Sequence, residues 1–368
     1  MNLYVHIPFC KQKCNYCAFH SQVIAPEHGE GGWDKYTDEI LQQLKILNSK
    51  LITHNSKNIV FRTIFFGGGT PSLMPVKYFE EIRKAIDLAP DAEWTVEANP
   101  GTLRSYDLLA LKDLGVNRLS VGMQSFDDDI LSWMGRIHSA RDALDLIESA
   151  AAIGLRVSAD FIYGFSGCNV GALCENINKL PIEHASLYEL SIEQGSKFAS
   201  SNTSNFLSFP RARKVAGAKM IKNDEELTRD YETIQTTLRL PRYEISNYGE
   251  PCRHNANVWA GEEYIGIGES AAGRILIDGA WYETKITNGE IVMNKLSFME
   301  RAMEMVITGL RTVHGVDISM LPANIINWDF VNDNPELFNP WPGRGKTHLK
   351  LSDKGFLLLD ALLPKIVL

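Results

Sequence analysis

Three cysteines lie close together in the run HIPFCKQKCNYC (6–17), at positions Cys10, Cys14 and Cys17. Together they offer three thiolates. A four-iron cluster normally takes four cysteine sulfurs, so a site with three leaves one iron with an open coordination position. The spacing therefore indicates a 4Fe-4S cluster whose open iron can bind a small molecule, and chemistry could begin there.

Two other uses of these thiols are weaker. Zinc could bind the triplet with His20 as fourth ligand, but zinc sites of this spacing usually carry a second close pair of ligands. The remaining cysteines, Cys168, Cys174 and Cys252, lie far downstream and far apart. A disulfide is disfavoured because the triplet has an odd count and nothing in the first residues resembles a secretion signal.

A glycine-rich run, FFGGGTPS (65–72), ends an apolar stretch that reads as a β-strand. Glycines let the backbone approach a ligand closely and point amide groups at it. Alone, such a run fits an ordinary strand-to-helix turn equally well. Four later motifs also place polar residues at or after probable strands: VEANP (96–100), SVGMQSF (120–126), GRIH (135–138) and DFIYG (160–164).

The cysteine spacing, with the aromatic Tyr16 just before the last cysteine, resembles the radical S-adenosylmethionine (SAM) superfamily. In that superfamily SAM chelates the fourth iron through its amino and carboxylate groups. The glycine run resembles the superfamily's site for the SAM amino group. This resemblance implies that Gly68, Gly69 and Thr70 lie at the cofactor.

SAM carries an ammonium, a carboxylate, a ribose diol and a sulfonium. Its pocket needs carboxylates and amides for the ammonium and the diol, and an arginine for the carboxylate. Glu97, Gln124, Arg136 and Asp160 are of these types, although each alone could be a surface or capping residue. Together with Tyr4 they match the SAM-contacting positions of the oxygen-independent coproporphyrinogen III oxidase branch, which implies that all five contact SAM.

Length and composition predict one large soluble body with a smaller domain, since the 368 residues are 45% apolar and 22% charged. Against 37 basic groups stand 45 acidic ones, and the net charge of −8 argues against nucleic acid as the main partner. No apolar run approaches the roughly 20 residues that span a bilayer. Six cysteines without an export signal predict a reducing cytoplasm.

Strand-like and helical patterns alternate over the first 195 residues. Strands are expected at 3–7, 63–66, 94–97, 118–122, 156–162 and 185–190. Helices are expected around 36–47, at 108–114 and 140–153, and after residue 169. Such alternation predicts an α/β fold with a parallel sheet, here a partial (β/α)6 barrel, with functional groups at the carboxyl ends of the strands. The motifs and the cysteine loop should meet on that rim.

Beyond about residue 195 the alternation stops, and three parts are predicted. Residues 1–195 form the core barrel, 196–290 complete it, and 291–368 form a small helical or winged C-terminal domain. Helical patterns are expected at 224–238, 299–310 and 348–363, and loops at 196–209 and 335–345.

Within the branch two activities compete. The oxidase decarboxylates two propionates of coproporphyrinogen III by hydrogen abstraction with the 5′-deoxyadenosyl radical, whereas its relatives, the HemW haem chaperones, share the SAM core and bind haem. The oxidase carries a further cysteine two residues after the third ligand, where this chain has Phe19. The oxidase also has a substantial segment before its first strand, whereas Tyr4 stands almost at the start here. Both differences favour the chaperone.

A haem-chaperone signature, HNxxYW, resembles the run HNANVW (254–259), in which Val258 replaces the tyrosine. His254 could offer an imidazole to haem iron, or it could be a hydrogen-bonded structural residue. Trp259 could stack on the porphyrin face.

Neighbouring residues add further expectations. Cys252 could ligate iron as a thiolate or be a buried core residue. Arg253 and Arg274 bracket the signature and could pair with the haem propionates.

The resemblance therefore implies a haem chaperone with a 4Fe-4S cluster, SAM and haem as cofactors. Its partners would be haem and a haem acceptor protein, which could be a membrane protein met transiently. No residue is assigned a catalytic role. The alternatives are an oxidase-type radical enzyme of porphyrin biosynthesis, and a protein that keeps the fold and cluster only as structure.

Overall fold

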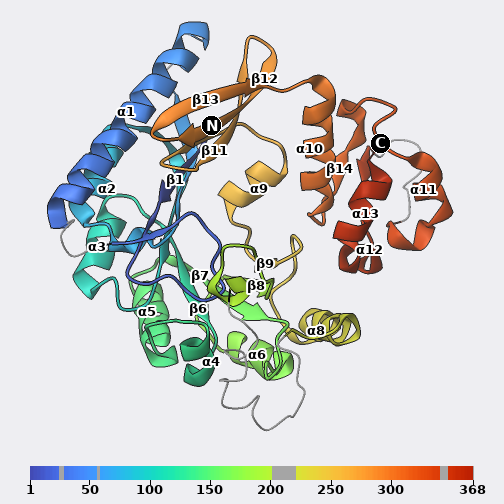
Figure 1. The fold of residues 1–368 in the computed structure, drawn as a ribbon, viewed down its shortest axis with the longest axis horizontal. Helices are drawn as coiled ribbons and strands as arrows, with labels where there is room; N and C mark the ends of the chain where they lie inside the picture. Colours follow the sequence, from blue (N-terminus) through green and yellow to red (C-terminus); the bar gives the residue numbers. More distant parts are fainter. Residues whose placement is uncertain (25–28, 56–58, 201–220, 340–346, 368) are drawn as a thin grey trace.

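One curved sheet of eleven strands runs through the computed structural model, which describes residues 1–24, 29–55, 59–200, 221–339 and 347–367 (Figure 1). The strand order is β13-β12-β11-β10-β1-β4-β5-β6-β7-β8-β9. From β10 through β8 all neighbours pair in parallel, and β9 and β11 to β13 pair antiparallel. The predicted α/β class and parallel sheet are thus confirmed.

The sheet strands are β1 (Asn2–Ile7), β4 (Val60–Gly68), β5 (Asp87–Ala98), β6 (Arg118–Gln124), β7 (Arg156–Tyr163), β8 (His184–Glu189), β9 (Asn247–Gly249), β10 (Tyr264–Ile267), β11 (Ala272–Ile277), β12 (Ala280–Thr287) and β13 (Glu290–Lys295). The short pairs are β2 (Phe9–Cys10) with β3 (Gln22–Val23), and β14 (Val316–Asp317) with β15 (His348–Leu349). All six predicted strands are present, and most are longer than predicted.

The helices are α1 (Gly29–Asn55), α2 (Val76–Lys84), α3 (Ser105–Asp113), α4 (Asp128–Trp133), α5 (Ala140–Ala152), α6 (Val170–Ile177), α7 (Lys197–Ser200), α8 (Asp224–Thr237), α9 (Arg253–Trp259), α10 (Phe298–Leu310), α11 (Trp328–Asp333), α12 (Asp353–Leu357) and α13 (Leu359–Ile366). Short 3-10 turns are η2 (Pro71–Leu73), η5 (Ile318–Met320) and η6 (Pro335–Leu337). The predicted loops at 196–209 and 335–345 lie partly outside the described residues.

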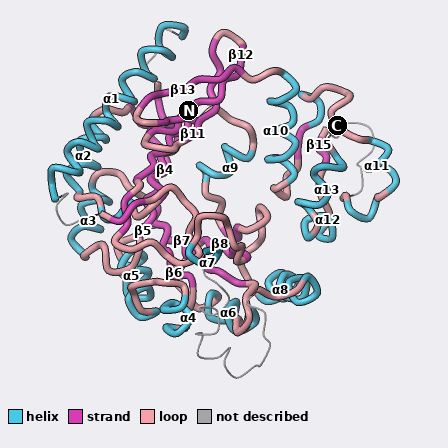
Figure 2. The backbone as a smooth tube through the Cα atoms, in the orientation of Figure 1, coloured by secondary structure: helices cyan, strands magenta, loops and turns pink. Residues whose placement is uncertain are grey.

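Alternate residues of the parallel strands face the outer helices, because side chains alternate between the two faces of a strand. In β1 these are Leu3, Val5 and Ile7, all fully buried in the main apolar core. The same core contains Ile40 of α1 and Phe79 of α2. Figure 2 shows these helices outside the strands. Burial of this apolar layer fixes which strand face turns inward.

The inner face of the sheet is polar. Its buried members include Asn2, His6, Thr63, Glu93, Thr95, Arg118, Ser120, Ser158, His184 and Ser186. Cross-strand hydrogen bonds join them, for example Thr63 to Asn2 at 2.9 Å and Ser158 to His184 at 2.7 Å. A parallel sheet covered on both faces usually reads as continuous apolar strands. The alternation therefore gives the barrel a polar interior whose side chains bond across the strands.

Helix α9 closes the barrel at the amino ends of the strands. Asn257 donates to the Asn2 side chain at 2.8 Å, and the His254 ring bonds the Thr63 hydroxyl at 2.9 Å. The barrel floor is therefore occupied by the segment that follows β9.

Two hairpins extend the sheet beyond β10, and sequence analysis missed them. Asp278-Gly279 joins β11 to β12, and Asn288-Gly289 joins β12 to β13. All four residues have φ between 50° and 76°. Asp-Gly and Asn-Gly between two strands are the preferred sequences of such two-residue turns. The signal was present in the sequence.

The C-terminal part has its own apolar core, built mainly from α10 to α13 and the β14–β15 pair. It contacts the barrel through several links: Val313 N donates to Tyr243 O at 3.0 Å, and the Arg301 guanidinium lies 4.0 Å from the Trp281 ring centroid. The helices at 298–310 and 353–366 lie close to the predicted ranges.

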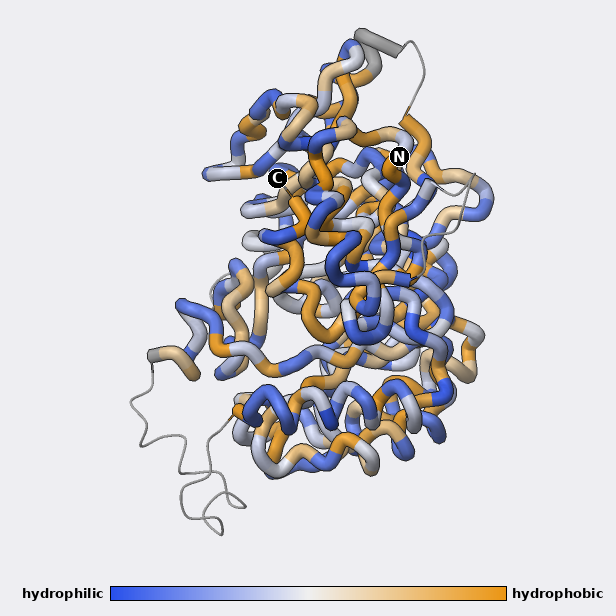
Figure 3. The backbone as a smooth tube through the Cα atoms, turned by 90° about the vertical axis from the view of Figure 1, so that its right-hand side faces the viewer, coloured by the Kyte–Doolittle hydropathy of each residue, from blue (hydrophilic) through white to orange (hydrophobic). Residues whose placement is uncertain are grey.

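None of the helices that the structure describes is long and apolar enough to cross a membrane. Hydropathy varies along the tube in Figure 3, where polar and apolar stretches follow one another at short intervals.

Replacing Phe79 tests the apolar layer. Its ring is fully buried and lies 4.9 Å from that of Phe66. Phe79→Ala should lower the free energy of unfolding by about 3–5 kcal/mol, because it opens a cavity in the core. Phe298→Ala is the matched control, since that ring is 69% exposed and should change stability by less than about 0.5 kcal/mol. Equal effects in chemical unfolding would contradict this packing.

Candidate functional site

A cavity of about 560 Å³ opens at the carboxyl ends of the parallel strands. Its lining brings together all but two of the residues predicted for the cluster and the cofactors: Cys10, Cys14, Tyr16, Cys17, Gly68, Gly69, Thr70, Glu97, Gln124, Arg136 and Asp160. They come from the loop after β1, from the ends of β4, β5 and β6, from the segment before α5, and from β7. The two predicted residues outside the lining are Tyr4 and His254.

The glycine turn is bonded directly to the cysteine loop. Gly69 N donates to Ile7 O at 2.7 Å, and Thr70 N donates to Phe9 O at 2.8 Å. A Cβ at Gly69 would lie 2.7 Å from Phe9 O and 3.0 Å from Cys10 Sγ. Only glycine therefore allows the two segments to approach this closely.

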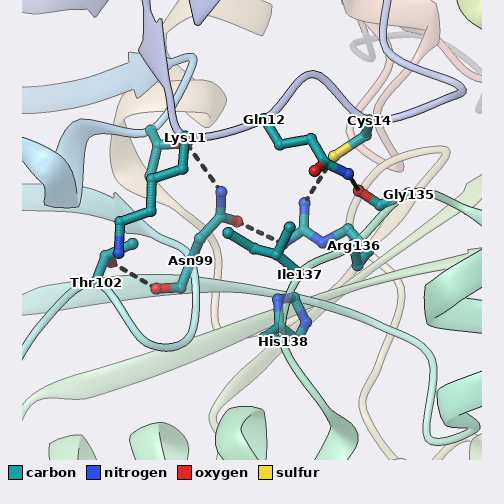
Figure 4. A pocket seen from close by; sticks show the side chains of 10 residues that line it. Lys11, Gln12, Cys14, Asn99, Thr102, Gly135, Arg136, Ile137 and His138 are labelled. Carbon is teal, nitrogen blue, oxygen red and sulfur yellow. Dashed lines mark hydrogen bonds between the residues drawn. The ribbon is translucent and has the colours of Figure 1, made fainter. Parts of the chain in front are cut away.

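The middle of the cysteine loop is bonded to the segment between α4 and α5. Asn15 N donates to Met134 O at 2.8 Å, and the Asn15 amide donates to Trp133 O at 2.7 Å. Gln12 Nε2 donates to Gly135 O at 2.9 Å, as Figure 4 shows. The loop is thus held on two sides of the cavity.

Burial raises the pKa of the Cys10 and Cys17 thiols. Metal binding must therefore release protons, because the thiolate is the ligand. All three thiols line the same cavity, and His20 is not among its lining residues. A cluster places each thiolate on a different iron. This arrangement of three thiols around one cavity suits a cluster.

Two carboxyl groups lie deep in the cavity. Glu97 accepts a hydrogen bond from Gly68 N at 3.1 Å, and Asp160 accepts one from Ser120 Oγ at 3.3 Å. Burial, and secondly the nearby Asp160 carboxylate, raise the pKa of Glu97 to about 8. Burial also raises the pKa of Asp160. A cationic ligand or hydroxyl groups here would favour the ionised forms.

Gln124 ends β6 in the left-handed backbone region, with φ of 64°, beside an irregularity in the pairing of β6 with β7. Such a conformation costs about 1–3 kcal/mol in a residue other than glycine, and it concentrates at functional sites. It directs the Gln124 side chain into the cavity lining.

Arg136 spans the rim between the cysteine loop and the strand ends (Figure 4). Its Nη2 donates to Gly122 O at 2.7 Å and to the Asn99 side chain, and its Nη1 lies 3.5 Å from Cys14 Sγ. Its Nε atom is buried, and no described residue accepts a hydrogen bond from it. The guanidinium thus joins the cysteine loop to the strand ends at the cavity lining.

Tyr4 lies one layer beneath the cavity. Its hydroxyl bonds His6 Nδ1 at 3.0 Å, and its ring packs against those of Phe65 and His254 at centroid distances of 6.2 and 6.5 Å. Tyr4 therefore supports the glycine turn from below and is not one of the residues that line the cavity.

His254 is enclosed in the barrel floor, with only 4% of its surface exposed. Nδ1 bonds the Thr63 hydroxyl, and its backbone amide donates to Glu93 at 3.0 Å. Burial lowers the pKa of His254 to about 3, so the ring is neutral. This environment is the one expected if His254 is a hydrogen-bonded structural residue. In this conformation the imidazole is not accessible to haem iron.

The residues around His254 are also engaged. Arg253 pairs with Asp91 at 3.2 Å, and Arg274 pairs with Glu304 at 2.7 Å, so either arginine would have to leave an ion pair to meet a propionate. The Arg311 guanidinium lies 4.9 Å from the Trp259 ring centroid. Cys252 is buried, and burial raises its pKa to about 11. These residues do not form a ready haem site.

Sequence reasoning missed several residues of the cavity lining: Asn99, Ser120, Tyr188, Glu189, Ser191 and Glu193. The alternation of polar and apolar residues along β6 and β8 is the signal that could have found Ser120 and Tyr188. Asn99 stands inside the VEANP run.

A family model described as "Radical SAM superfamily" matches residues 4–180. The heme chaperone HemW of Synechocystis is 30% identical over 87% of this chain and 80% of its own length. HemW of Escherichia coli is 33% identical over 75% and 70% of the two chains. The mitochondrial radical S-adenosyl methionine domain-containing protein 1 of Bos taurus is 30% identical over 97% and 82%.

The fold has a solved counterpart in coproporphyrinogen III oxidase (HemN) from Escherichia coli, with a TM-score of 0.72 and 20% identity over 99% of this chain and 89% of that one. The shared fold, the matched superfamily model and relatives that match most of the chain lead to one assignment. The chain belongs to the radical SAM superfamily, in the HemN-like branch that includes the HemW proteins.

Proposed function

We propose that this protein binds SAM on a 4Fe-4S cluster held by Cys10, Cys14 and Cys17, and that it acts as a haem chaperone. The observation that carries the cofactor proposal is the single cavity lined by the three thiols and the SAM-type residues. The haem proposal rests on the HemW relatives and on the HNANVW signature. We further propose a reducing cytoplasm as its location, because such a cluster needs free thiols.

The cavity residues suit the groups of SAM. Glu97 and the glycine turn would hold the amino group, and Gln124 and Asp160 the ribose diol. Arg136, whose guanidinium lines the cavity, would hold the carboxylate. A reduced cluster held by these thiols would be able to supply an electron to the SAM sulfonium.

The charge of the cavity bears on the oxidase alternative. Four carboxyl side chains line it, Glu97, Asp160, Glu189 and Glu193, against two cations, Lys13 and Arg136. The proposed SAM site uses Arg136. Among the described lining residues, Lys13 alone would then remain to pair with a porphyrinogen propionate near the cluster, and Glu189 and Glu193 would oppose it.

Haem and His254 require a rearrangement. For the imidazole to reach haem iron, α9 must leave its position against Thr63 and Glu93. We therefore propose that haem binds after this movement, and we assign no haem pocket in the conformation described.

Titrating haem into wild type and His254→Ala tests whether His254 is the iron ligand. Equal haem affinity of the two proteins would remove His254 from the proposal. The haem acceptor would be a protein that receives haem on contact.

Anaerobic reconstitution tests the cluster. Wild type should hold about four iron atoms per chain, with an electron paramagnetic resonance spectrum that changes when SAM is added. Cys14→Ser should lose most of the iron, because it removes one thiolate from the cavity. Cys168→Ser is the control, since that thiol lies outside the cavity lining, and it should keep wild-type iron. Iron loss in both variants, or in neither, contradicts the proposed ligands.

The oxidase alternative has its own readout. Coproporphyrinogen III is added to the reduced, SAM-loaded protein, and 5′-deoxyadenosine and carbon dioxide are measured. The chaperone proposal expects neither product to depend on the porphyrinogen, and it expects haem to pass from the protein to an apo-haemoprotein. Stoichiometric carbon dioxide release would assign the oxidase activity instead.

Glu97→Gln should separate stability from cofactor binding. The folded-state pKa of Glu97, about 8, exceeds its ordinary value of 4.5, so the folded protein loses stability as pH rises between these values. Glutamine removes that loss, so between pH 5 and pH 8 the variant should lose about 3–4 kcal/mol less stability than wild type. SAM affinity should fall about tenfold, because a charge-assisted bond is lost.

Chemical unfolding across pH and SAM titration measure the two effects of Glu97→Gln. Glu148→Gln, on the exposed face of α5, is the control and should change neither quantity. A variant whose stability runs parallel to wild type across this pH range would contradict a buried, protonated Glu97.

A further inference from the structure

We propose that His6 is a positioning residue that holds the exposed end of the cysteine loop beneath the glycine turn and so sets the place of Cys17. The relevance of this contact to a cluster rests on the proposed function, but the contact itself does not. His6 is 7% exposed and lies on β1 with its ring on the inner face of the sheet.

The His6 ring fills the space under the glycine turn. A Cβ at Gly68 would lie only 2.6 Å from His6 Cε1, so the ring touches the turn backbone directly. Gly68 itself has φ of 111°, which a residue with a side chain rarely adopts. The ring and the turn therefore fix each other's position.

Both ring nitrogens of His6 have partners, and the partners determine the tautomer. Nε2 lies 2.9 Å from the backbone oxygen of His20, which can only accept, so Nε2 carries the proton. Nδ1 is then an acceptor, and the Tyr4 hydroxyl donates a hydrogen bond to it over an O–N distance of 3.0 Å. Burial lowers the pKa of His6, in agreement with a neutral ring. One side chain thus links Tyr4, the glycine turn and the cysteine loop.

The contact between His6 and His20 lies at the end of the cysteine loop, beyond its other contacts to the barrel. The start of the loop is bonded to the glycine turn, and its middle is bonded through Asn15. Residues 18–20 are exposed. The chain then pairs with β2 from Gln22, the first residue of β3, whose amide donates to Pro8 O at 2.7 Å. Cys17 lies between Asn15 and His20. The His6 contact therefore limits the movement of this thiol relative to the other two.

Two conservative variants separate the ring nitrogens. The asparagine amide in His6→Asn can occupy the place of Nδ1 and keep the Tyr4 contact, but it is too short to reach His20. The longer amide in His6→Gln can donate to the His20 oxygen. His184→Asn is the matched control, because His184 is also buried with both ring nitrogens bonded, to Ser158 and Tyr243, away from the cysteine loop.

Hydrogen exchange on the protein without iron tests the contact itself. The amides of Gln22 and Ile24 close the end of the loop by donating to Pro8 O and Cys10 O. His6→Asn should speed exchange of these two amides at least tenfold, while His6→Gln and His184→Asn leave them near wild type. Equal protection of these amides in His6→Asn and wild type overturns the inference, whether or not the protein binds a cluster.

Iron retention tests its consequence. After reconstitution, the rate of iron loss to a chelator should rise about 10- to 100-fold in His6→Asn and much less in His6→Gln, as for other groups that position metal ligands. Wild-type retention in His6→Asn would show that the contact does not position the cluster ligand. Absence of iron from wild type would instead overturn the proposed function, and the exchange result would still decide the contact.

Discussion

Two backbone hydrogen bonds, from the glycine turn to the end of β1, are the constraint on which the site depends. Gly69 and Thr70 donate to Ile7 and Phe9, so the loop that carries the thiols must lie beside the turn proposed for the SAM amino group. Backbone groups make both bonds, and the Thr70 hydroxyl adds a contact to Cys10 Sγ at 3.6 Å. A larger residue at Gly69 would separate the two segments.

The barrel interior combines this site with a polar network that extends to the floor. Glu93 illustrates the arrangement: one carboxylate oxygen accepts from the His254 amide, and the other pairs with Arg156 at 3.2 Å. Satisfied buried networks of this kind specify one geometry, whereas unsatisfied groups cost stability. The deep carboxyls Glu97 and Asp160 belong to the same interior, where they accept hydrogen bonds from Gly68 N and Ser120 Oγ.

The sequence predicted the parallel strands and most of the cavity because both have local signals. The glycine run, Glu97 and Asp160 stand at strand ends, and parallel strands bring their carboxyl ends to one rim. The surroundings of His254 had no such signal, because the contacts that enclose it come from β4 and β5, about 160 to 190 residues earlier. Nor could spacing show that Arg253 and Arg274 are paired, since Asp91 and Glu304 are distant in the chain.

The enclosed imidazole of His254 has a kinetic consequence. If His254 ligates haem iron, haem binding must wait for α9 to move away from the strands, because the ring is buried and bonded to Thr63. The observed association rate would then level off as haem concentration rises, at the opening rate of the helix. Because the ring is already neutral, that plateau would be insensitive to pH near neutrality.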